Sequence, residues 1–82
     1  MKTQKEQVAE WLLNNGSITA FSAIYQLGIT QVATRIFELE QEDGIVLNHV
    51  KRLGTAKNGR TFHFTEYVLP EEARKKVEAW LK

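Results

Sequence analysis

Five polar side chains recur at helical spacing between residues 30 and 43. They are Gln31, Thr34, Arg35, Glu38 and Gln41. In the major groove of DNA, arginine pairs with guanine, glutamine with adenine and glutamate with the amino group of cytosine. Thr30 precedes this face, and backbone N–H groups at such a helix start can bind a phosphate. A solvated polar face is the alternative, and a pair between Arg35 and Glu38 would favour it.

Basic residues gather farther along the chain, where they could bind phosphate groups. They are Lys51, Arg52, Lys57 and Arg60, with Asn58 among them. Cationic side chains supply most of the sequence-independent affinity of proteins for DNA, and a flexible tip that contains glycine can enter a minor groove. The alternative is a solubilising loop in which lysine protects the edge of a hairpin.

The sequence contains no grouping typical of catalysis or metal binding. It has no cysteine, and its two histidines, His49 and His63, lack an acidic pair at ligand spacing. We find no Ser-His-Asp order, no glycine-rich phosphate loop and no paired catalytic carboxylates. We therefore expect neither an enzyme nor a bound metal or cofactor.

Length and composition indicate one soluble domain. The chain has 82 residues, of which 43% are hydrophobic and 26% charged, with a net charge of +1. Residues 30–43 carry one arginine against four carboxylates, a net charge of −3, whereas residues 44–69 have a net charge of +3. There is no apolar run long enough to span a membrane and no signal peptide, so we expect a cytoplasmic protein without a membrane partner.

The stretch from Ile18 to Gly44 predicts two helices joined by a tight turn. Thr19 and Thr30 are expected to cap the first and second helix, and Gly28 to end the first in a left-handed conformation. So short a turn makes the helices cross steeply, as in a helix-turn-helix. The expected inner sides comprise Ala20, Phe21, Ile24 and Leu27, then Val32, Ala33, Ile36, Phe37 and Leu39.

The flanking segments predict one more helix and a β-hairpin. Residues 3–15 form an amphipathic pattern, and Ser17-Ile18-Thr19 is a candidate strand that pairs with a later one. Residues 45–53 and 61–69 are rich in β-branched and aromatic residues, and Asn58-Gly59 lies at the expected hairpin tip. Phe62 and Phe64 share one parity and Tyr67 and Leu69 the other, so one pair is expected in the core and the other on a helix or a second subunit.

A last amphipathic helix is predicted over residues 71–81. Pro70 and the glutamates that follow it are typical of a helix start. This helix comes after an already complete fold, so its apolar residues could form a homodimer interface. The candidate interface residues are Val77, Trp80 and Leu81.

Taken in order, the elements predict a single α+β domain over residues 1–82. It is a winged helix-turn-helix, with the helix-turn-helix at about 19–43, the wing at about 45–69 and an added C-terminal helix. The sequence resembles the small winged helix-turn-helix proteins of prophages and related bacterial elements. The matching residues are Ile18, Thr19, Ala20, Ala23, Leu27, Gly28, Ile29, Thr30, Ala33, Arg35, Ile36, Leu39, Tyr67 and Leu69.

This resemblance implies binding to double-stranded DNA, as a small regulator of transcription or recombination. The second helix would enter the major groove and the wing would hold the backbone. A winged helix that binds another protein instead is the alternative, which the near-neutral charge and the acidic run at residues 38–43 favour.

Overall fold

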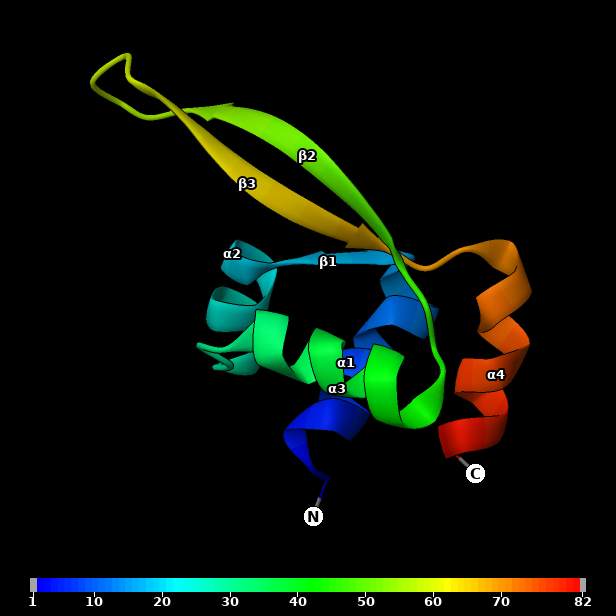
Figure 1. Ribbon diagram of the computed structural model, residues 1–82. Helices are drawn as coiled ribbons and strands as arrows, with labels where there is room; N and C mark the ends of the chain where they lie inside the picture. The colour runs from blue at the N-terminus through cyan, green and yellow to red at the C-terminus, as the bar shows by residue number, and fades with distance from the viewer. Residues whose placement is uncertain (1, 82) are drawn as a thin grey trace.

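The computed structural model describes residues 2–81, whose elements follow one another in the order expected for a winged helix (Figure 1). The elements are α1 (Gln4–Asn15), β1 (Ser17–Thr19), α2 (Ala20–Ser22), η1 (Ala23–Leu27), α3 (Val32–Asp43), β2 (Asn48–Thr55), β3 (Thr61–Val68) and α4 (Glu71–Leu81). The strands form an antiparallel sheet in the order β1-β3-β2, so the short first strand pairs with a later one as predicted. Within residues 2–81, no helix has the length and apolar character needed to cross a membrane.

Helix α1 begins and ends where the sequence predicts. Thr3 Oγ1 accepts the N–H of Glu6, and the Glu6 carboxylate accepts the N–H of Thr3 in return, which forms a capping box. These bonds to Thr3 lower the pKa of Glu6, because they favour its ionised form. At the other end, the N–H of Gly16 bonds to the carbonyl of Leu12 and ends the helix.

The first helix of the predicted pair is less regular than expected. Thr19 caps it as predicted, since its Oγ1 accepts the N–H of Ser22 at 3.1 Å. The α-helical geometry then gives way at Ala23 to a π-helical turn, η1. Gly28 ends this turn in the predicted left-handed conformation, with φ of 68°, and leads directly into the turn before α3.

The apolar side chains of α2 and η1 lie largely outside the core. The residues wrongly expected inside are Ala20, Phe21 and Ile24. Phe21 packs edge-to-face against Phe62 and Phe64 of β3, with ring centroids 5.7 and 5.6 Å away. Tyr67 and Leu69, of the other parity, pack in or against the core. The question of parity is thereby decided: Tyr67 and Leu69 are the pair in or against the core, and Phe62 and Phe64 pack on α2 of the same chain.

The hairpin of β2 and β3 forms the predicted wing and projects beyond the helices in Figure 1. The protein is accordingly elongated, with extents of 44 × 28 × 21 Å. At the tip, the N–H of Gly59 bonds to the carbonyl of Ala56 at 3.0 Å, and Asn58 Oδ1 accepts the N–H of Arg60. Gly59 is in the left-handed region, with φ of 84°, as a three-residue hairpin loop requires.

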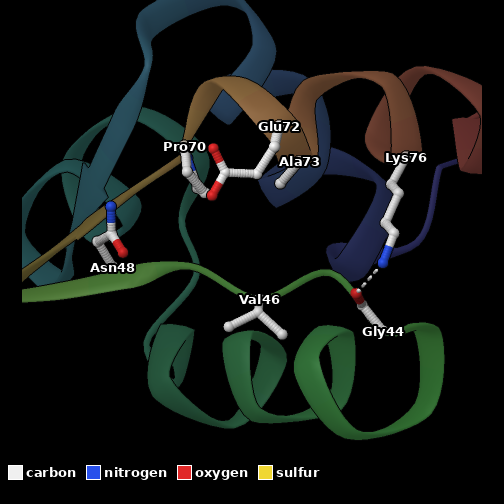
Figure 2. Close-up of a pocket in the computed structure, with 7 residues that line it drawn as sticks. All are labelled: Gly44, Val46, Asn48, Pro70, Glu72, Ala73 and Lys76. Atoms are coloured by element: carbon white, nitrogen blue, oxygen red, sulfur yellow. Dashed lines mark hydrogen bonds between the residues drawn. The ribbon is translucent and has the colours of Figure 1, made fainter.

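Helix α4 occupies its predicted range but does not offer a free apolar side. It packs on α1, and Lys76 Nζ donates a hydrogen bond to the carbonyl of Gly44 at 3.4 Å (Figure 2). The expected dimer interface comprised Val77, Trp80 and Leu81. Val77 is fully buried inside the monomer, so its place in such an interface is wrong. Trp80 and Leu81 are only partly buried against the same core, and the homodimer stays a prediction.

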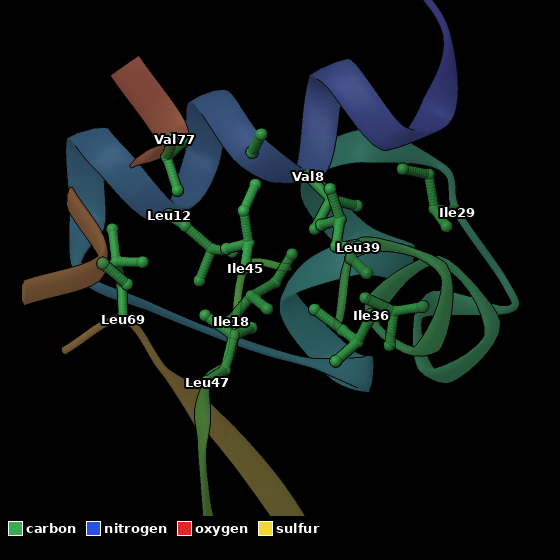
Figure 3. Close-up of a cluster of buried hydrophobic side chains, with 14 residues drawn as sticks. Val8, Leu12, Ile18, Ile29, Ile36, Leu39, Ile45, Leu47, Leu69 and Val77 are labelled. Carbon is green, nitrogen blue, oxygen red and sulfur yellow. The ribbon is translucent and has the colours of Figure 1, made fainter. Parts of the chain in front are cut away.

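The core lies between α1, α3, α4 and the body end of the sheet (Figure 3). Its buried members are Val8, Ala9, Leu12, Ile18, Ala23, Ile29, Val32, Ile36, Leu39, Ile45, Leu47, Leu69, Ala73 and Val77. Ile45 and Leu47 were expected in a strand, but β2 begins only at Asn48. The segment before β2 instead runs past the core and buries both of these side chains, which anchors the base of the wing to α3.

Candidate nucleic-acid interface

Helix α3 begins one residue later than predicted. Gln31 occupies the N-cap position and makes no side-chain cap, so the prediction that Thr30 caps this helix is wrong. Thr30, Gln31 and Thr34 are all exposed to solvent. The uncapped start of α3 therefore presents polar side chains and backbone N–H groups on the same side of the molecule.

The inner side of α3 is narrower than predicted. Val32, Ile36 and Leu39 are buried, whereas Ala33 and Phe37 are exposed, and Phe37 retains 61% of its accessible surface. Successive helical residues are about 100° apart, so Ala33 lies about 60° and Phe37 about 100° around the helix from Ile36, the nearest buried residue. The expectation that they face the core is therefore wrong. Ala33 and Phe37 instead form an apolar ridge on the outward face of α3.

Arg35 and Glu38 are engaged with each other. Arg35 Nε lies 3.1 Å from Glu38 Oε1, and both side chains are largely covered, at 26% and 28% exposure. This is the competing role that the sequence left open for Arg35. In this structure, Gln31 and Thr34 are the more accessible polar residues of the face.

The acidic run at the end of α3 is held by partners from other elements. Lys5 of α1 lies 2.8 Å from Asp43 and 3.4 Å from Glu42, and the hydrogen bond to Asp43 raises the pKa of this lysine. Glu40 Oε2 lies 2.9 Å from Nε2 of His49 at the base of β2. Lys5 thus offsets part of the negative charge at the end of α3, and the hydrogen bond with His49 holds Glu40 at the base of the wing.

The wing divides two of the predicted phosphate ligands between its faces. Neighbouring residues of a strand point to opposite faces, so Lys51 and Arg52 cannot share one. Lys51 is cross-strand partner to Thr65 and lies on the same face as Tyr67, which packs against the core. Arg52 lies on the other face, where its Nε donates to Glu66 Oε1 at 2.9 Å. The predicted strip of four cations is therefore not continuous.

The tip of the wing carries the remaining predicted ligands. Lys57, Asn58 and Arg60 are all exposed. Among residues 2–81, neither Lys57 nor Arg60 forms a salt bridge with a carboxylate. Their charges remain available to an anionic ligand.

A groove joins the start of α3 to the wing. It has a volume of about 380 Å³ and is lined by Ala20, Phe21, Thr30, Gln31, Val32, Ala33, His63, Phe64, Thr65 and Tyr67. We call it the α3–wing groove. A neighbouring hollow on the wing shares His63, Phe64 and Thr65 with it and is lined by Lys51 as well. The structure thus places Thr30 and Gln31 in the groove and Lys51 in the neighbouring hollow, and it leaves Arg52 outside both.

His63 and Thr65 of this groove were not among the predicted ligands, and neither was Phe37 of α3, which does not line the groove. His63 and Thr65 line the groove from β3, and they share a face with Lys51 because alternate residues of paired strands do so. Phe37 was assigned to the core because it is apolar. The angular position of Phe37 relative to Ile36 and Leu39 could have identified it as exposed from sequence alone.

Comparison with known families supports the architecture. A family model for a winged helix-turn-helix domain matches residues 3–72. This range contains α1, the helix-turn-helix and the whole wing, while most of α4 lies beyond it. A search of curated proteins found no match.

Proposed function

The chain belongs to the winged helix-turn-helix domain family, and from this premise we propose that it binds double-stranded DNA. In the proposed complex, α3 enters the major groove and the wing contacts the adjacent sugar-phosphate backbone. Gln31 and Thr34 are the polar residues with free access to base edges. The uncapped N-terminus of α3 adds backbone N–H groups suited to a phosphate.

The α3–wing groove is the observation that carries this proposal. The exposed start of the helix and the Lys51 face of the wing meet there, so one ligand can contact both. The cations at the tip extend this surface outward by the length of the hairpin. A duplex has the repeating negative charge that such a spaced set of cations fits.

The charge distribution also favours DNA over a protein ligand at this surface. The acidic residues that argued against DNA are largely paired, Glu40 with His49 and Asp43 with Lys5. Lys51, Lys57 and Arg60 form no such pair among the described residues. Although the total charge is near zero, these three cations of the wing are therefore available to an anionic ligand. A small phage-type regulator of transcription or recombination is the role we propose, on the resemblance described above.

A salt titration tests the proposal. We expect binding to duplex DNA of mixed sequence in fluorescence anisotropy at about 50 mM salt, and a steep loss of affinity towards about 200 mM. Replacing Lys57 and Arg60 by alanine should weaken binding to all duplexes alike and make the salt dependence shallower. No binding at either salt concentration would instead indicate a winged helix that recognises another protein.

A further inference from the structure

Phe37 is an exposed aromatic residue at the centre of the outward face of α3. The residue is 61% exposed. Full burial of such a side chain typically stabilises a fold by about 1.5–3 kcal/mol, and most of that stabilisation is absent here. Ala33, one turn earlier, and Gln41, one turn later, are also exposed and lie on the same ridge. Within residues 2–81, Phe37 is in none of the aromatic pairs, which involve other rings.

The neighbours of Phe37 on the helix show which way this ridge faces. Ala33 lines the α3–wing groove together with His63 and Thr65 of β3. Glu40, less than one turn after Phe37, contacts His49 at the base of β2. Phe37 lies between these two residues along the helix axis but about 40–60° farther around the helix, so it stands beside the groove, on the side that faces solvent. An apolar ring is thus placed where the proposed duplex would lie.

The polar residues around Phe37 restrict what the face can recognise. Arg35, the side chain best suited to guanine, is largely covered and held near Glu38. The other exposed groups on this face are two amides, two methyl groups and one ring. They belong to Gln31 and Gln41, to Ala33 and Thr34, and to Phe37. Amides pair with adenine, and apolar groups contact the 5-methyl group of thymine.

We propose that Phe37 is a specificity-determining residue that packs against thymine methyl groups in the major groove, so that the protein prefers A·T pairs under α3. This inference rests on the proposed DNA binding. The cations of the wing favour a duplex as the occupant, because Lys51 lines the hollow next to the groove and Lys57 and Arg60 are exposed at the tip. Each methyl group buried should tighten binding about fourfold, which corresponds to about 0.8 kcal/mol.

The test compares two duplexes that differ only in the 5-methyl group. One is a short duplex of alternating A·T pairs, and the other has deoxyuridine in place of every thymidine. We expect the wild-type protein to bind the thymine duplex at least about fourfold more tightly, in anisotropy titrations at one salt concentration. Phe37→Ala should bind both duplexes equally, and Phe37→Leu should keep part of the preference.

Val46→Ala is the matched control. Val46 is 63% exposed, close to the exposure of Phe37, but it lines a groove against α4 with Pro70 and Lys76 (Figure 2). This variant should keep the full preference for thymine. Circular dichroism melting of each variant establishes that the fold is intact, and a change at such exposed positions should shift the melting temperature little.

The outcomes separate this inference from the function on which it rests. Salt-dependent binding without any preference between the two duplexes would refute the role of Phe37 and leave DNA binding standing. A preference of the same size in Phe37→Ala would also refute it, because the methyl group would then act through other side chains or through the shape of the DNA. No binding to either duplex would refute the proposed function itself. Self-association of the wild type that Phe37→Ala abolishes, with DNA binding unchanged, would assign the ring to a protein contact instead.

Discussion

Lys51 and Arg52 are neighbours in the sequence but lie on opposite faces of the wing, which predicts that, of the two, only Lys51 contributes to DNA binding. Lys51 borders the α3–wing groove and forms no ion pair within the described chain, whereas Arg52 lies on the opposite face beside Glu66. We expect Lys51→Gln to weaken binding to mixed-sequence duplex DNA. Arg52→Gln removes the same charge from the next residue and should leave the salt dependence of binding unchanged.

The magnitude follows from the number of phosphates that the side chain can reach. One phosphate contact contributes about −0.9 to the slope of log affinity against log salt on duplex DNA. Loss of Lys51 should therefore make this slope shallower by about 0.9. Between about 50 and about 200 mM salt, a fourfold range, the wild type should lose about 3.5-fold more affinity than the variant does.

Anisotropy titrations of a labelled duplex at four or more salt concentrations measure this difference directly. The stability of each variant must be measured beside it, since Arg52→Gln removes one of the partners of Glu66. Equal changes of slope in the two variants would show that the face of the strand is irrelevant. A larger change in Arg52→Gln would mean that DNA meets the other face of the wing, and the assignment of the α3–wing groove would then be wrong.

Three further predictions concern the fold that supports this surface. Hydrogen bonds from Ser17 and Arg52 lower the pKa of Glu66 below its ordinary value of 4.5. The ionised carboxylate therefore contributes its full stability above pH 4.5, and this contribution is lost as the pH falls through the lowered pKa. In urea unfolding at pH 7 and at about pH 3, the free energy of unfolding should fall less for Glu66→Gln than for the wild type. Thr19→Ala should destabilise the protein by about 1 kcal/mol, because it removes a helix cap. Thr30→Ala should destabilise it much less, because Thr30 caps no helix. A lower melting temperature for Thr30→Ala than for Thr19→Ala would contradict this prediction. Ile36→Ala, at a position only 1% exposed, should cost about 2–5 kcal/mol in urea unfolding, and a cost close to zero would place this side chain outside the core.

Much of the local structure was determined by the sequence alone. Thr19 and Gly28 begin and end the first helix of the pair, and Asn58-Gly59 lies at the hairpin tip, as predicted. These features depend on bonds between residues that are close in the chain, such as the N–H of Ser22 and the oxygen of Thr19. Local chemistry therefore suffices to place them, together with the order of the elements and the winged helix that this order implies.

The surface that would meet DNA was decided by tertiary structure. The helical spacing of Phe37 from Ile36 and Leu39 indicates that it faces outward, but the closeness of the other elements to α3 decides how wide the buried stripe is and leaves Phe37 exposed. The acidic end of α3 looked unsuited to DNA until its partners were known, and Lys5 lies far from Asp43 in sequence. The width of the buried stripe on α3 and the pairing of its charges depend on contacts between distant segments, which propensity and periodicity within one segment do not specify.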